Sequence, residues 1–124
     1  MPIQRGHARV LFNEGAFAED TMRSGRAGAE TLRETRGQFE RDGVEIKALR
    51  RCDPEGRDGS ELPACFKVYL PAPHGKFGMV FRFIRDSDGL ALRYLAFGVR
   101  HHPRDSHAQT VYEIAHRRLH GQLP

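Results

Sequence analysis

The sequence predicts an α+β fold in which helices pack on one face of an antiparallel sheet. Residues 7–41 contain one short alternating stretch and then two stretches with helical spacing of their apolar residues. Residues 65–99 contain three alternating, mostly apolar stretches separated by turn-forming residues, and an amphipathic stretch follows them. Strands and helices are therefore segregated along the chain, which favours a strand, two helices, a meander of three or four antiparallel strands and a final helix. The sheet face without helices is then the candidate functional surface.

The first half begins with a strand at residues 7–12, HARVLF, whose apolar residues alternate. Asn13 is a suitable N-cap for a helix over residues 15–22, since its side chain can accept a hydrogen bond from a free backbone N–H. A Ser-Gly break ends this helix. A second helix is expected over residues 29–41, where a thin apolar stripe indicates a helix lying on another layer, and the following Asp-Gly pair ends it.

The second half supplies the rest of the sheet. Residues 44–52 alternate well enough to predict a strand, whereas residues 53–61 are turn-forming and show no periodicity. Apolar residues at steps of three, one and four give the last helix one apolar face. The three strands of the meander are expected at residues 65–70, 77–84 and 90–99, and the last helix at residues 107–120, with Val111, Ile114, Ala115 and Leu119 on its apolar face.

Length and composition bound the class of protein. With 124 residues, 39% hydrophobic and 29% charged, residues 1–124 fit one globular domain. No apolar run approaches the roughly 20 residues that cross a bilayer, and the polar start lacks the apolar core of a secretory signal, so we expect a cytoplasmic protein with no membrane partner. Two cysteines, Cys52 and Cys65, form no disulfide framework or metal-ligand pattern; we expect Cys65 to be buried, Cys52 half-exposed, and no metal or cofactor.

Positive charge is concentrated in the second half of the chain. Residues 62–124 carry 9 Lys and Arg against 4 Asp and Glu, and also hold six of the seven histidines, whereas residues 1–61 carry 11 against 12. A half-molecule with a net charge of +5 attracts phosphates, which favours a nucleic acid as partner. The alternative is a soluble, Arg-rich surface that binds nothing.

Four segments, LPACFKVYL, GKFGMVFRF, LAFGVR and VYEIAHRRL, carry a resemblance to a known family. In this order and at about this spacing they resemble the RelE/ParE family, the small toxins of bacterial type II toxin–antitoxin systems. The resemblance covers about residues 62–119; residues 1–61 agree only in their strand-helix-helix pattern. It implies a RelE-like fold and a ribosome-dependent mRNA endoribonuclease, or mRNA interferase, that inhibits translation and is neutralised by a cognate antitoxin protein.

The resemblance also implies three catalytic residues. Attack of a ribose 2′-hydroxyl on the adjacent phosphate needs a proton acceptor, a proton donor for the leaving 5′-oxygen, and positive charge on the phosphate. Matching the family pattern residue by residue assigns proton transfer to Lys67, the phosphate and leaving oxygen to Arg100, and substrate positioning to Tyr112. A base at neutral pH requires a Lys with a lowered pKa, a His, or an ionised Tyr.

Two positions depart from the family pattern. Tyr69 stands where mRNA-cleaving relatives have a second strand lysine, and Gly78 where they have an arginine. Other basic groups nearby are candidates to compensate, and a histidine among them would serve as acid or base. The auxiliary candidates are Lys76, Arg82, His101, His102, Arg104 and His116, the last of which shares a helix face with Tyr112 and His120.

Two other functions remain open at this stage. A ParE-like gyrase inhibitor would have the same scaffold, no hydrolytic site, and a helical hairpin that contacts its protein target. The departures at Tyr69 and Gly78 favour this alternative, whereas the presence of Lys67, Arg100 and Tyr112 favours the nuclease. A third possibility is a catalytically inactive descendant that binds nucleic acid or protein.

Overall fold

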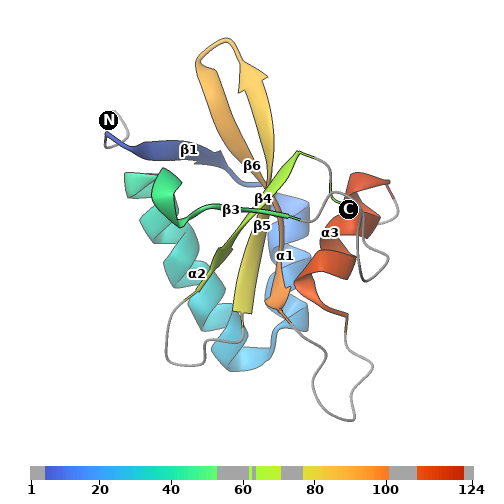
Figure 1. Cartoon of the computed structure of the whole chain (residues 1–124). Helices are drawn as coiled ribbons and strands as arrows, with labels where there is room; N and C mark the ends of the chain where they lie inside the picture. The colour runs from blue at the N-terminus through green and yellow to red at the C-terminus, as the bar shows by residue number, and fades with distance from the viewer. Residues whose placement is uncertain (1–4, 53–61, 63, 71–76, 101–108, 122–124) are drawn as a thin grey trace.

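A computed structural model describes residues 5–52, 62, 64–70, 77–100 and 109–121 (Figure 1). Within these residues the chain forms three α-helices and one curled, mixed sheet, which confirms the α+β class. The elements in chain order are β1 (His7–Leu11), α1 (Glu14–Arg23), α2 (Gly25–Asp42), β2 (Val44–Glu45), the 3-10 turn η1 (Ile46–Ala48), β3 (Arg50–Arg51), β4 (Cys65–Tyr69), β5 (Phe77–Asp86), β6 (Gly89–Val99) and α3 (Val111–Leu119).

The sheet has the strand order β2-β1-β6-β5-β4-β3. The predicted meander is present, since β4, β5 and β6 pair in sequence and antiparallel. β1 pairs with β6 in parallel, a contact between segments about 80 residues apart that the local pattern does not reveal. A one-residue bulge interrupts the β5–β6 pairing: Val80 lies opposite Ala96, while the next residue, Phe81, lies opposite Tyr94.

Helices cover both faces of the sheet, so the expectation of helices on one face is wrong. Met79 and Phe97 belong to a core cluster formed with α1 and α2, whereas their neighbours Val80 and Ala96 belong to a second cluster formed with α3. Successive residues of a strand point to opposite faces, so α3 lies on the face opposite α1 and α2. The run of five buried residues that begins β5 has this cause, because a strand covered on both sides is apolar throughout.

The predicted strand at residues 44–52 is two short strands joined by a 3-10 turn. Its first part pairs with β1 at one edge of the sheet, and its second part pairs with β4 at the other edge. Five residue steps separate Glu45 from Arg50 and span at most about 18 Å, while the edge strands of a flat six-stranded sheet would lie about 24 Å apart. The sheet must therefore curl to bring its two edges within reach of this segment.

Helix boundaries follow from capping groups. The Asn13 side chain accepts from the Ala16 N–H at 3.1 Å, which confirms the predicted N-cap of α1. α2 begins four residues earlier than expected, because Gly25 has a φ of 71° that allows a sharp change of direction after α1. The last helix begins at Val111, so the predicted start at residue 107 is wrong: Thr110 is extended and is the N-cap, and it forms a capping box with Glu113.

A buried ion network holds α1 and α3 against β6. β1 pairs only with residues 91–93 of β6, so the following part of β6 has no strand on that side. Asp20 of α1 fills this edge: it accepts from the Phe97 N–H at 3.0 Å and from the Tyr94 hydroxyl. The Arg118 guanidinium of α3 donates to both Asp20 oxygens, at 2.7 and 2.8 Å, and to the Leu95 carbonyl at 2.9 Å. Three elements are thereby linked through one carboxylate.

Candidate functional site

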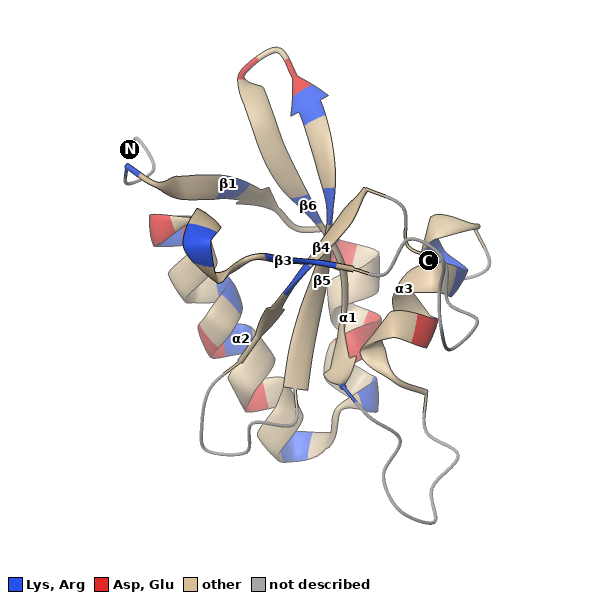
Figure 2. Ribbon diagram, viewed as in Figure 1, with Lys and Arg blue, Asp and Glu red and all other residues tan. Residues whose placement is uncertain are grey.

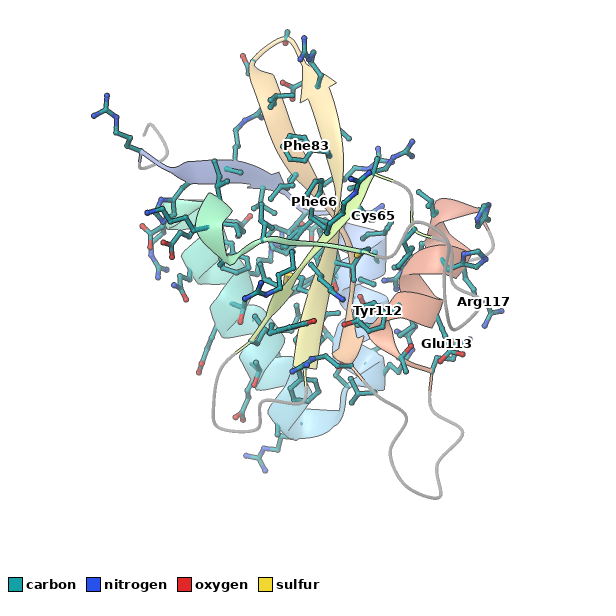
Figure 3. All side chains as sticks on the ribbon, viewed as in Figure 1. Cys65, Phe66, Phe83, Tyr112, Glu113 and Arg117 are labelled. Atoms are coloured by element: carbon teal, nitrogen blue, oxygen red, sulfur yellow. The ribbon has the colours of Figure 1, made fainter. Side chains whose placement is uncertain are left out.

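The three residues that the sequence assigns to catalysis lie in one cluster on the α3 face of the sheet. Lys67 and Tyr69 project from β4 on this face, because their partners across the strand pair, Val80 and Gly78, share the face packed by α3. Arg100 follows β6 directly, and Tyr112 lies in the first turn of α3 (Figure 3). Residues from three separate elements are thus brought together.

Lys67 lies between two tyrosine rings. Its Nζ is 5.0 Å from the ring centroid of Tyr112 and 5.5 Å from that of Tyr69, a distance at which a cation interacts with the face of an aromatic ring. Burial disfavours the charged form of Lys67, but the attraction of Tyr112 and a hydrogen bond with Tyr69 outweigh it, so the pKa of Lys67 is raised above its ordinary value. Lys67 is therefore a cation at neutral pH, suited to neutralise a phosphate or donate a proton.

Tyr112 is neutral at the same pH. It is half-buried, and this burial is the main reason that the pKa of its hydroxyl is raised, against the opposing effect of Lys67. The capping box of Thr110 and Glu113 fixes the helical turn that carries it: Glu113 N–H donates to the Thr110 hydroxyl at 3.3 Å, and Thr110 N–H donates to Glu113 at 2.9 Å. The ring is a positioned hydrogen-bond donor and a flat apolar surface.

The Arg100 side chain contacts Tyr69 and Gly78, the two positions that differ from the expected RelE-like pattern. Its guanidinium carbon lies 3.8 Å from the ring centroid of Tyr69, so the two planar groups are in close contact. The aliphatic stem of Arg100 crosses Gly78, where an added Cβ would be 3.1 Å from the Arg100 Cγ. An arginine at position 78 would occupy the space of this stem, and a lysine at position 69 would offer no ring. Tyr69 and Gly78 therefore together form the surface on which the Arg100 side chain packs.

The auxiliary candidates divide into two groups. Arg82 and His116 are described: Arg82 is exposed on the α3 face of β5, and His116 is half-buried one helical turn after Tyr112. The His116 ring contacts that of His120, with a centroid distance of 4.4 Å. Lys76, His101, His102 and Arg104 lie outside the described residues.

Sequence reasoning missed two basic residues beside this cluster, Arg50 and Arg93. Arg50 of β3 lies opposite Lys67, and Arg93 of β6 lies opposite Arg82. In Figure 2, Lys and Arg positions occur on β3, β4 and the adjoining parts of β5 and β6. Their positions depend on strand register across three pairings, and no local signal in the sequence gives that register.

Both cysteines are buried beneath this surface. Cys65 was expected to be buried, but Cys52 is only 2% exposed, so the expectation of a half-exposed Cys52 is wrong. The Cys52 N–H donates to the Cys65 carbonyl at 3.0 Å, which places both in the core beneath α3. Burial raises the pKa of Cys52 to about 12 and that of Cys65 to about 11, so both are inert thiols at neutral pH. Among the described residues, no group of three His, Cys, Asp or Glu is arranged to hold a metal ion.

A groove of about 630 Å³ lies between α2 and the strands β2 and β4. Three of its lining residues, Glu34, Asp42 and Glu45, are acidic, and His7 is the basic group among them. An acidic lining repels phosphates, so this groove does not suit a nucleic acid. The cation–aromatic cluster of Lys67, Tyr69, Arg100 and Tyr112 has the positive charge that such a ligand requires.

Comparisons of the chain with protein-family models, with curated proteins and with solved structures found no match. None of the described helices combines the length and the apolar character needed to cross a membrane.

Proposed function

We propose that this protein is a RelE-like toxin that cleaves mRNA on the ribosome and is neutralised by a cognate antitoxin. One observation carries the proposal: Lys67, Arg100 and Tyr112, chosen from the sequence by their chemistry and by the resemblance, meet in one cluster around Tyr69. The cluster is cationic and aromatic, a combination that neutralises a phosphate and provides flat surfaces for a base.

The roles follow from the protonation states. In the reaction the ribose 2′-oxygen attacks the adjacent phosphorus and the bond to the 5′-oxygen breaks, which leaves a 2′,3′-cyclic phosphate and a 5′-hydroxyl. Arg100 would hold the phosphate, because a guanidinium presents two parallel N–H donors to its oxygens. Lys67, protonated because of its raised pKa, would stabilise the charge that develops and donate the proton to the 5′-oxygen.

Tyr112 would position the substrate, through its hydroxyl or by stacking on a base. The proton of the 2′-hydroxyl requires an acceptor other than Lys67 and Tyr112, since both are protonated at neutral pH. An imidazole meets this requirement. We assign the role to a histidine among His101, His102 and His116, and single His→Gln variants identify which one.

The test compares Arg100→Ala with Arg26→Ala in bacterial cells. Arg26 is on α2, its side chain is 95% exposed, and it pairs only with Glu30 among the described residues, so it is a matched control for loss of one arginine. We expect induction of the wild type and of Arg26→Ala to arrest growth and to produce mRNA ends at codon positions by primer extension. Arg100→Ala should not arrest growth, and its mRNA cleavage should be roughly 10²- to 10³-fold lower. Its circular dichroism spectrum should be unchanged.

The other outcomes identify the alternatives. Growth arrest without mRNA ends, unaffected by Arg100→Ala, would contradict the nuclease and favour the gyrase inhibitor. Full expression of a folded protein without growth arrest would contradict both toxins and leave a binding module.

A further inference from the structure

Two arginines face each other directly on the sheet beside the cation–aromatic cluster. Arg82 of β5 and Arg93 of β6 are cross-strand partners, and both side chains are exposed. The bulge at Val80 and Phe81 creates this pairing, because without the shifted register Arg82 would lie opposite Tyr94. Within the described part of the chain, neither arginine has a carboxylate within ion-pair distance, whereas Arg9 has one and Arg23 and Arg36 have two each.

This arrangement is unfavourable for the free protein. Like charges directly opposite on neighbouring strands destabilise a sheet, and here no counter-charge from the described residues relieves the repulsion. Bulges commonly re-aim a side chain near a functional site. A pair of guanidinium groups side by side is, in contrast, well suited to bind one phosphate from two directions.

The Arg82–Arg93 pair lies on the same face of the sheet as the cation–aromatic cluster. Phe81 and Tyr94 point into the core under α1 and α2, so Arg82 and Arg93, next to them, point to the α3 face. Arg82 lies opposite Cys65, two residues before Lys67 on the same face of β4, and a step of two residues along a strand is about 7 Å. On the other side of β4, Arg50 of β3 lies opposite Lys67 and adds a further basic residue to this row.

We propose that Arg82 and Arg93 form a second phosphate-binding site for single-stranded RNA, which holds the backbone next to the nucleotide bound at Lys67, Arg100 and Tyr112. The inference rests on the proposed function for the identity of the polyanion. The RNA then crosses the α3 face of the sheet from Arg100 toward Arg93. The site binds without sequence preference, because it contacts phosphate and no base edge.

The test measures binding of fluorescent 2′-O-methyl RNA, which has no free 2′-hydroxyl, by fluorescence anisotropy at several salt concentrations. A dinucleotide and a single-stranded oligonucleotide of about ten nucleotides are the probes. The variant is Arg82→Gln/Arg93→Gln, and the control is Arg26→Gln/Arg33→Gln, which removes two exposed arginines from α2. Both variants change the net charge equally.

We expect Arg82→Gln/Arg93→Gln to bind the longer RNA about 10-fold more weakly, with a slope of log affinity against log salt smaller by about 0.7 for the lost phosphate contact. Binding of the dinucleotide should be unchanged, and the control should match the wild type on both probes. Relief of the like-charge pair should also raise the Tm by about 1 to 4 °C, which shows that the variant is folded.

The results separate this inference from the proposed function. Equal affinities and slopes for the variant and the control, or no binding of the longer RNA by the wild type, would overturn the inference even if the protein cleaves mRNA. Tighter binding of an acidic peptide than of the RNA, measured by competition, would also overturn it, since the pair would then bind a protein segment. Loss of RNA binding in the variant, together with a wild type that cuts no mRNA in cells, would support the inference and contradict the nuclease.

Discussion

The two ends of α3 place cationic side chains in opposite situations. In the last turn, the side chain of Arg118 is 3% exposed, and its guanidinium donates to Asp20, Glu19 and the Leu95 carbonyl. Near the first turn, Lys67 lies 5.0 Å from the Tyr112 ring and has no carboxylate partner among the described residues. The first arrangement is a closed ion network, and the second is a cation beside aromatic rings.

The difference teaches which arginines and lysines hold the fold and which can serve a ligand. Both oxygens of Asp20 already accept hydrogen bonds from protein donors, so the network has no capacity for a substrate. A cation over a ring retains its charge at a modest gain of about 0.5 to 2 kcal/mol, and a phosphate can replace that contact with a stronger one. Total charge does not reveal this distinction, whereas the partners of each cation do.

The largest effect is expected from breaking the closed network. Asp20→Ala leaves Arg118 buried without its main counter-charge and removes the acceptor of the Tyr94 hydroxyl and the Phe97 N–H. We expect a loss of about 3 to 5 kcal/mol in the free energy of unfolding, measured by urea denaturation. Glu14→Gln, which removes the exposed carboxylate that pairs with Arg36, is the control and should cost much less. Similar losses for both variants would contradict the structural role of the network.

A smaller effect on stability, but a large one on activity, is expected at the other end of α3. Lys67→Met keeps the length of the side chain and removes its charge, so we expect cleavage to fall by about 10²- to 10³-fold with a change in unfolding free energy below about 1 kcal/mol. Lys47→Met, at an exposed position of η1, is the control and should retain full activity. Equal activity of the two variants would remove Lys67 from the site.

The pH dependence of cleavage shows whether Lys67 acts in its protonated or its neutral form. Because the pKa of Lys67 is raised above its ordinary value of about 10.4, its charged form persists through neutral and mildly alkaline pH. If the charged form acts, the Lys67-dependent rate stays level toward pH 10 and falls only as the pH rises through the raised pKa. A rate that instead increases as Lys67 loses its proton would assign it the role of the base.

The sequence predicts the parts of the fold that depend on local pattern. The meander, the Asn13 cap and the amphipathic last helix follow from alternation, capping chemistry and helical spacing. The parallel pairing of β1 with β6 and the position of α3 on the second face depend instead on contacts between distant segments. The break of residues 44–52 into β2 and β3 also depends on the curl of the whole sheet, which no window of sequence contains.

The candidate site shows the same limit. Lys67, Arg100 and Tyr112 could be chosen because their chemistry and a family resemblance indicate them one residue at a time. The packing of Arg100 on Tyr69 and Gly78 could not be predicted, because the sequence presents these two residues only as departures from a pattern. The Arg82–Arg93 pair depends on a one-residue bulge, and a register without the bulge would separate the two arginines.

The smallest and most discriminating effect is expected at Gly78. An alanine Cβ there would lie 3.1 Å from the Arg100 Cγ, so the stem must move by a few tenths of an ångström. We expect Gly78→Ala to lower cleavage by about 2- to 5-fold, because catalysis is sensitive to small displacements of a phosphate-binding group. Stability should be unchanged or higher by up to about 1 kcal/mol, since alanine has fewer unfolded conformations than glycine.

Gly98→Ala is the matched control for this change. Gly98 lies opposite Gly78 in the same row of the sheet, but a Cβ there would meet Ile114 and Val111 at 3.5 to 3.6 Å, which is ordinary contact, and would not touch Arg100. Cleavage assays and urea denaturation on both variants separate the two effects. A loss of activity in Gly78→Ala alone, with stability retained, would show that Gly78 acts through the position of Arg100. Equal losses in both variants would show that Gly78 only packs in the sheet and that its contact with Arg100 does not affect catalysis.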